Sequence, residues 1–400
     1  GIGKDEIEEI VKQETNETDI ENIATTYNYM LQYAAQGTSD PERSKLYHLL
    51  RRNTYELTDK AEFLKACRKN SGHFADKCRY MRQNPPRTFH ELHVGLESLS
   101  EDMALAGLLA GEKDGQPDTQ KNLALRHEQM TDELFDKIWT STQWSEEEFQ
   151  QANAFLSSLL IPVNDLAVMI SAVTLSLLRL FDNRKFQFLL NAYQAETNPL
   201  VTQRALIGIA LTAYYQEKRL SLYPELQAAL SLLGESQSAS ENMLIIQILL
   251  LLSRETEKIE KKMREEIIPQ MMRTPGIYKP DLKIIDIEDL EDKNPEWSKD
   301  MAQIEKNIRE LGELQMEGAD TYMSTFAQLK SYPFFRQAAH WFYLFDKQMP
   351  EISSLFENEK KGQKSLMSFI VNSPVFCNSD KYSFCLTLYN IPAQQQEMLT

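Results

Sequence analysis

Three apolar stretches of twelve residues decide the fold: AVMISAVTLSLL from Ala167, ALIGIALTAYYQ from Ala205 and MLIIQILLLLSR from Met243. They begin 38 residues apart along the chain. Each is apolar on nearly all sides, which is typical of a helix that neighbouring helices cover on both flanks. We therefore expect three equivalent buried helices, each of which opens a repeat unit.

Each apolar stretch is followed by a segment whose apolar residues recur at the spacing of one helix face. These segments run from Phe186 to Tyr193, from Leu226 to Leu233 and from Ile259 to Ile267. A buried helix followed by an amphipathic helix, repeated at this period, predicts an all-α fold: a right-handed α-α superhelix, or solenoid, of HEAT-like or tetratricopeptide-like hairpins. The alternative is an irregular bundle whose neighbouring helices match by coincidence.

Turn signals and a charged connector divide the rest of the chain. We expect helical hairpins over residues 1–144, the repeats over 145–275, an acidic linker over 276–296 and a C-terminal helical segment over 297–400. The linker contains prolines and a run of like charges, which disfavour regular structure.

Three local patterns predict elements outside the apolar stretches. Ser145, with Glu148 three residues later, forms a capping box that starts a helix. We expect helices to resume near residue 297 and another helix from Tyr332 to Phe345. The segment from Tyr382 to Tyr389 alternates weakly, as a strand would, but we favour a helix there.

Composition and charge exclude several classes of protein. The net charge of −16 and a pI near 5.0 disfavour nucleic acid and anionic membranes as partners of the whole chain. No stretch reaches the roughly 18 uninterrupted apolar residues of a membrane span, so we expect no membrane insertion. Four cysteines in 400 residues are too few for a disulfide scaffold and favour a reducing, cytoplasmic location.

Motifs that assemble catalytic groups locally are absent from the sequence. There is no G-x-S-x-G turn, no G-x-x-x-x-G-K phosphate loop and no G-x-G-x-x-G fingerprint. His73, Cys78, His90 and His93 lie close in sequence but lack the spacing of zinc ligands. The acidic run at 286–292 has Glu291 where a calcium loop needs glycine. We therefore predict no catalytic, cofactor-binding or metal-binding residues.

A basic segment is the first candidate for partner binding. Residues 41–90 carry twelve Lys or Arg against five Asp or Glu, and aromatic residues lie between them. Its candidate contact residues are Arg51, Arg52, Arg79 and Arg82. Such a segment can bind a phosphate or an acidic peptide. The alternative is a solvated helix surface, or one that pairs with acidic groups of the same chain.

An aromatic cluster is the second candidate. It contains Trp341 and Phe342 among six aromatic residues between Phe334 and Phe345. If exposed, it would form a peptide-binding face. If it packs between helices, it needs no partner.

The segment FAQLKSYPFF from Phe326, followed by Trp341 and Phe342, resembles a stretch found in large Bacteroidetes proteins described as tetratricopeptide-repeat proteins. The resemblance extends over about residues 140–400. It implies a helical-repeat fold whose repeats continue beyond Thr400, and it assigns no functional residues. The Trp-Leu-Gly spacing typical of tetratricopeptide repeats is absent from this chain.

Together these observations favour a non-enzymatic scaffold that binds a protein or a peptide along a solenoid surface. We expect an anionic concave face that selects basic or neutral ligands. Two alternatives stay open: an enzyme whose active site is assembled from distant residues, and a structural or regulatory segment of a longer chain.

Overall fold

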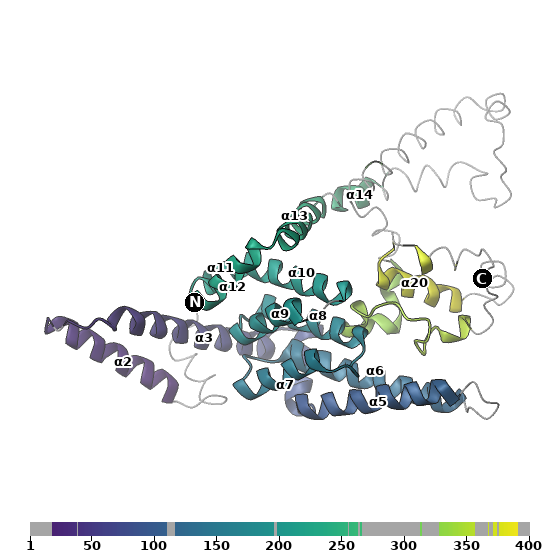
Figure 1. The fold of residues 1–400 in the computed structure, drawn as a ribbon, viewed down its shortest axis with the longest axis horizontal. Coiled ribbons are helices and arrows are strands. Elements are labelled where there is room, and N and C mark those ends of the chain that lie inside the picture. The colour runs from purple at the N-terminus through teal and green to yellow at the C-terminus, as the bar shows by residue number, and fades with distance from the viewer. Residues whose placement is uncertain are drawn as a thin grey trace, which may run out of the picture. The chain divides into compact units, whose positions relative to one another are not determined.

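All regular structure in the described part of the chain is helical (Figure 1). A computed structural model describes residues 18–37, 39–109, 117–195, 198–254, 256–262, 328–356, 371–373 and 376–390, and the single residues 265, 313 and 367. Within these ranges no strand occurs, which confirms the predicted all-α class. None of the helices described there has the length and apolarity needed to cross a membrane.

The described helices up to residue 262 follow one another in chain order. They are α2 (Thr18–Ala35), α3 (Arg43–Lys69), α4 (His73–Gln83), α5 (Phe89–Leu109), α6 (Pro117–Thr140), α7 (Glu146–Ser157), α8 (Val163–Arg179), α9 (Asn183–Ala195), α10 (Pro199–Tyr215), α11 (Glu217–Leu220), α12 (Pro224–Glu235), α13 (Gln237–Leu252) and α14 (Thr256–Lys262). The three apolar stretches lie in α8, α10 and α13, as predicted.

Between α4 and α12 the chain alternates between two rows of helices (Figure 1). In the first row α4 packs on α6, α6 on α8, and α8 on α10. In the second row α5 packs on α7, α7 on α9, and α9 on α12. The sides of α8 are therefore covered by neighbours in both rows, which explains why almost every side chain of this helix is buried.

Contacts between successive hairpins repeat the 38-residue period. Within the first row His127 of α6 pairs with Asp165 of α8 at 2.8 Å. Within the second row Asn191 of α9 donates a hydrogen bond to Asn153 of α7, again 38 residues away. The hairpin α6–α7 is thus equivalent to α8–α9. The repeats predicted over residues 145–275 include α7 but not α6.

Helix α7 begins with the predicted capping box. The Ser145 hydroxyl accepts a hydrogen bond from the Glu148 backbone N–H, and the Glu148 carboxylate accepts one from the Ser145 N–H. Two of the four N–H groups left open at a helix start are satisfied in this way.

We expect Ser145→Ala to lower the free energy of unfolding by about 1 kcal/mol, the usual loss for an N-cap serine. Urea denaturation followed by circular dichroism measures this difference. Ser231→Ala is the control, because Ser231 is exposed within α12 and bonds only to a carbonyl of its own helix. An equal effect of both substitutions would contradict the capping role.

The prediction that the third apolar stretch is covered on both flanks is wrong. In α13 the side chains of Leu244, Ile245 and Leu251 are 57%, 53% and 64% exposed. Ala239 is the buried residue of this helix. Apolar side chains are buried only where a neighbouring element reaches them, and an apolar pattern does not by itself supply that neighbour.

Helix α3 crosses the ends of the hairpins. Its Glu56 carbonyl accepts a hydrogen bond from Gln143 in the α6–α7 connection. Its Asp59 pairs with Arg219 of α11 through two hydrogen bonds of 2.6 and 2.7 Å. Phe63 and Leu64 share a core cluster with Leu180 at the end of α8. Helix α3 therefore connects several hairpins that are not adjacent to it in sequence.

The chain divides into two compact units, Gly1–Ser240 with Gln337–Ser353, and Glu241–Arg336 with Ser354–Thr400. In the second unit α20 (Asn378–Tyr389) packs on the 3-10 turn η2 (Gln328–Ser331). Lys330 donates to Asp380 at 2.7 Å, which joins the two elements. The helix favoured over residues 382–389 is confirmed.

The helix predicted from Tyr332 to Phe345 is not formed. Instead the 3-10 turns η3 (Pro333–Arg336) and η4 (Ala338–Trp341) end in a non-helical stretch. Tertiary contacts made by the aromatic side chains of this region override local helix propensity. The predicted linker 276–296 and the predicted helix from 297 lie outside the described residues, apart from Glu313 and Gln328–Leu329.

Candidate functional site

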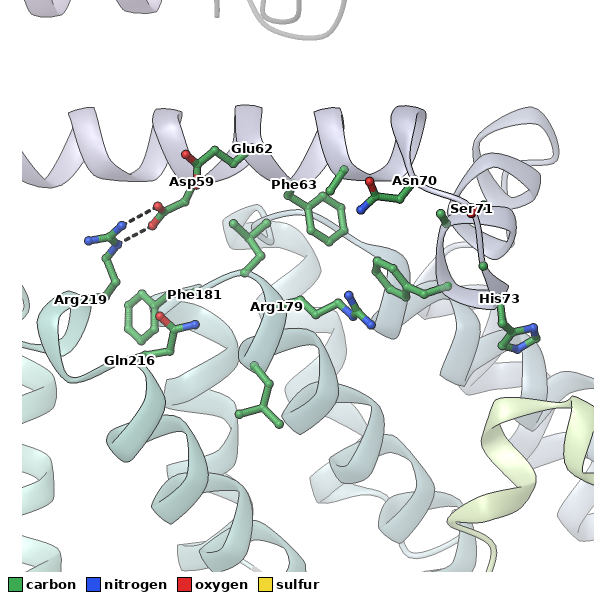
Figure 2. A pocket seen from close by; sticks show the side chains of 16 residues that line it. Asp59, Glu62, Phe63, Asn70, Ser71, His73, Arg179, Phe181, Gln216 and Arg219 are labelled. Carbon is green, nitrogen blue, oxygen red and sulfur yellow. Dashed lines mark hydrogen bonds and ion pairs between the residues drawn. The ribbon is translucent and has the colours of Figure 1, made fainter. Parts of the chain in front are cut away.

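A pocket of about 550 Å³ lies between α3, the start of α4 and the C-terminal ends of α8 and α10 (Figure 2). Asp59 and Arg219 face each other at its edge and neutralise each other. The Arg179 guanidinium lies 3.9 Å from the centre of the Phe74 ring. Because these charged groups are engaged within the protein, the pocket does not provide the strongest candidate site.

The stronger candidate is a segment of the chain that lies against the first row of helices. We call Gln337–Ser353 the docked segment; it belongs to the same compact unit as α3 to α12. Its turn η4 contacts α6. Met349 and Ile352 are buried, whereas Trp341 is 45% exposed. A segment that contains no α-helix is thus held by helices that precede it by more than a hundred residues.

Phe342 is recognised through both its side chain and its backbone. Its ring stacks on Phe135 of α6, with ring centres 5.8 Å apart and planes inclined by 24°. Its carbonyl accepts a hydrogen bond of 2.6 Å from Arg204 of α10. The Arg204 guanidinium also donates to Ala167 O and to the Ser171 hydroxyl of α8. Residues from two helices, α6 and α10, therefore contact one residue of the docked segment, and α8 holds the Arg204 guanidinium in place.

The Arg204 guanidinium is largely enclosed, and burial lowers its pKa to about 10. It remains protonated at neutral pH. A buried cation that donates to backbone carbonyls binds main chain irrespective of sequence, which is how extended peptides are commonly held.

His340 lies between two carboxylates of α6. Its Nε2 is 3.2 Å from Glu128 Oε1 and 3.3 Å from Asp132 Oδ2. Burial by itself would lower the pKa of His340, but hydrogen bonding and the charges of Asp132 and Glu128 outweigh it and raise the pKa to about 9. Without another cation, the imidazole is therefore charged at neutral pH.

Two more groups of the docked segment join this cluster. The Tyr343 hydroxyl donates a hydrogen bond of 2.6 Å to Asp132 Oδ1, and burial followed by the Asp132 charge raises the pKa of this hydroxyl well above its usual value. Burial raises the pKa of the Glu351 carboxyl, and the adjacent charge of Glu128 raises it further.

The start of the docked segment is held by a third polar contact. Gln337 Nε2 donates to Asp136 Oδ2 at 3.1 Å, and Lys77 of α4 donates to the same oxygen at 2.8 Å. Burial raises the pKa of Asp136, against the opposing effect of Lys77. Polar contacts along α6 thus recur at Glu128, Asp132 and Asp136, one helical turn apart.

The predicted aromatic residues Trp341 and Phe342 are neighbours on the docked segment but lie in different surroundings. Phe342 packs on α6, whereas Trp341 is nearly half exposed. Tyr343 is also buried in this unit, while Phe334 and Phe335 are buried within the other unit. Packing therefore accounts for most of the predicted cluster.

The predicted basic residues do not form one cluster. Arg52 of α3 lies over the Tyr223 ring and within 4.0 Å of Glu225 at the start of α12. Arg79 of α4 donates to Cys67 O and Asn70 O at the far end of α3 and pairs with Asp76. Arg52 and the carbonyl of Cys67, to which Arg79 binds, are about 22 Å apart along α3 at 1.5 Å per residue. The two arginines therefore lie at separate places on this helix. Arg51 and Arg82 are exposed on α3 and α4.

The histidines and the cysteine that lie close in sequence between residues 73 and 93 do not share one site. His93 lies 3.4 Å from Glu97 on α5, and His73 contacts the Trp139 ring. Cys78 is buried beside Cys67, and their hydrogen bond, followed by burial, raises the pKa of its thiol. Among the described residues, the ligand-type atoms that gather closely are those of Glu128, Asp132 and His340.

The sequence did not predict this last cluster, because His340 is more than 200 residues away from Glu128 and Asp132. Glu128 and Asp132 are four residues apart, so they lie on one face of α6, but such pairs are common on exposed helices. No periodicity connects them to His340. Only the position of the docked segment brings the three together.

Comparisons of the chain with protein-family models, with curated proteins and with solved structures find no match. The resemblance to helical-repeat proteins of Bacteroidetes therefore stays a prediction. The function has to be argued from the geometry of this chain.

Proposed function

We propose that the chain is a solenoid-type scaffold that binds extended protein or peptide segments along its first row of helices. The observation that carries the proposal is the docked segment. Non-helical backbone is held there by Arg204 of α10, by ring stacking on Phe135 and by the carboxylates of α6. A surface that binds such a segment of its own chain has the chemistry to bind a similar segment of another.

Three features support the solenoid part of the proposal. Neighbouring helices pack in two rows, contacts recur at 38 residues, and each hairpin contacts chiefly the hairpins next to it. The charge of −16 supports a protein or peptide partner instead of nucleic acid. All four cysteines fall in the described ranges and none forms a disulfide there, which supports a cytoplasmic location.

The test is binding of the docked segment in trans. A fluorescent peptide of residues 335–353 is titrated into the full chain and into a variant carrying Phe342→Ser and Tyr343→Ser. In the wild-type chain the tethered segment competes at an effective concentration on the order of millimolar. We therefore expect the variant to bind the peptide at least about tenfold more tightly, as measured by fluorescence anisotropy.

Two controls separate groove binding from non-specific adhesion. The peptide carrying the same two substitutions should lose binding to the variant chain, since it lacks the stacking ring and the Tyr343 hydroxyl. Adding Phe135→Ala to the variant chain should weaken binding of the wild-type peptide. If the variant binds the wild-type peptide no better than the substituted one, the docked segment is ordinary packing and the proposal is wrong.

A further inference from the structure

We propose that Glu128, Asp132 and His340 bind a divalent transition-metal ion of the zinc type, which fastens the docked segment to α6. One ligand atom from each of the three residues lies within 4.8 Å of the other two. The inference does not depend on the proposed function, because it concerns how this segment is held and not what else the surface binds.

The two distances from His340 to the carboxylates match a metal site, and the ligand oxygens of Glu128 and Asp132 lie within 4.8 Å of each other. His340 Nε2 is 3.2 Å from Glu128 Oε1 and 3.3 Å from Asp132 Oδ2. In a tetrahedral site with ligand bonds of about 2.0 to 2.1 Å, adjacent ligand atoms are about 3.3 to 3.4 Å apart. An ion can therefore bind with small movements of the side chains.

The surroundings fix the orientation of one ligand. The Tyr343 hydroxyl donates to Asp132 Oδ1, which leaves Oδ2 facing His340. The same hydroxyl lies 3.4 Å from the Glu128 carbonyl. Outer hydrogen bonds of this kind orient the carboxylates of metal sites.

The balance of charge calls for a cation. Glu351 lies beside Glu128, so three carboxyl groups and one imidazole share a largely buried space. The oxygens Glu128 Oε2 and Glu351 Oε2 are buried, and no N–H or hydroxyl of the described residues donates to them. Two other basic groups on or beside α6 pair with other carboxylates. His127 pairs with Asp165, and Lys77 pairs with Asp136. Even with His340 charged and Glu351 neutral, Glu128 and Asp132 bring two negative charges against one positive charge, and uncompensated buried charge is strongly unfavourable.

The set of ligands indicates the class of metal. Calcium and magnesium prefer sites made of oxygen atoms alone, whereas an imidazole with carboxylates suits zinc, manganese, iron or cobalt. Glu351 does not belong to this group of ligand atoms. The ion would link two residues of α6 with His340 of the docked segment.

The test uses the full chain after treatment with a chelator. Zn²⁺ is titrated into it by isothermal calorimetry, and Co²⁺ is added as a spectroscopic probe of coordination. We expect one equivalent of Zn²⁺ to bind, with a visible Co²⁺ absorption typical of a tetrahedral site. The variant carrying Glu128→Gln and Asp132→Asn should bind Zn²⁺ at least about 100-fold more weakly, because two of the ligands lose their charge.

Matched variants make the outcome decisive. Glu97→Gln removes the carboxylate next to His93, a His–Glu pair outside the cluster, and should change the affinity less than about twofold. His340→Gln is a second way to remove a ligand if the double variant fails to fold, which circular dichroism reports. The proposal is overturned if the wild-type chain binds no Zn²⁺ below millimolar concentration, since His340 is then only an imidazolium ion pair. It is equally overturned if Glu97→Gln abolishes binding while the cluster variants retain it.

Discussion

Replacing Lys185 by methionine is expected to lower the free energy of unfolding by about 4 kcal/mol, within the range for breaking a buried charged contact. Lys185 of α9 has no exposed surface. Its ammonium donates to Thr142 O at 2.7 Å, to the Ser176 hydroxyl at 2.9 Å and to Ser141 O at 3.2 Å. Methionine fills the space but leaves these acceptors without their donor.

Urea denaturation of the two proteins at pH 7 measures this loss. Lys218→Met is the control, because Lys218 is exposed on α11 and its replacement should change stability by less than about 0.5 kcal/mol. If Lys185→Met were as mild as the control, the ammonium would contribute nothing to the packing of α9 on the preceding hairpin.

The difference in unfolding free energy between the wild-type chain and Lys185→Met should also change with pH. Burial lowers the pKa of Lys185 from 10.5 to about 8, against the opposing charges of Asp182 and Glu148. Between pH 8 and 10.5 the unfolded chain therefore holds a proton that the folded chain has lost, so stability rises with pH. The advantage of wild type over Lys185→Met should widen in this window, by at most about 3 kcal/mol at 1.36 kcal/mol per unit. A constant difference would contradict the lowered pKa.

Replacing Gly208 by alanine is expected to destabilise the protein by about 2 kcal/mol, although alanine is the better helix former by about 1 kcal/mol. A Cβ atom at Gly208 would lie 2.3 Å from Thr174 Oγ1 of α8 and 3.0 Å from Leu189 Cδ1 of α9. The Thr174 hydroxyl is fixed by its hydrogen bond to Ile170 O. Helix α10 therefore approaches its neighbours too closely at this point to accommodate a side chain.

A double-mutant cycle tests the cause. Thr174→Ala removes the obstructing oxygen, and combining it with Gly208→Ala should recover at least half of the loss. Gly107→Ala is the matched control, since a Cβ there meets nothing within 4 Å, and it should stabilise α5 slightly. Equal effects of the two glycine substitutions in urea denaturation would show that the helix approach at Gly208 is not tight.

Features that depend on neighbouring residues in sequence were predictable. The capping box at Ser145 and the helix at residues 382–389 are formed as expected. The first apolar stretch is largely buried, as its nearly continuous apolar pattern predicted, whereas the second is buried on one side and leaves Ile207, Tyr214 and Tyr215 exposed. In each case the interactions that stabilise the element lie within a few turns of the chain, so residue spacing reports them.

Two predictions failed for reasons of tertiary structure. The apolar pattern of α13 is like that of α8, but its side chains are exposed because burial depends on which elements surround the helix. The segment after Tyr332 has helical spacing, yet Phe342 and Tyr343 make their contacts with α6 from non-helical backbone. Local propensity is worth fractions of a kcal/mol per residue, whereas burying an aromatic ring is worth more.

The sequence by itself determined the class of the fold, because apolar residues recur at helical spacing along the chain and the helices they form bury their apolar sides on one another. It did not determine the candidate site. His340 meets Glu128 and Asp132 only because the docked segment returns to α6, and Arg204 meets the Phe342 carbonyl for the same reason. Such contacts join residues far apart in the chain, so no local pattern specifies them and only the tertiary structure brings them together.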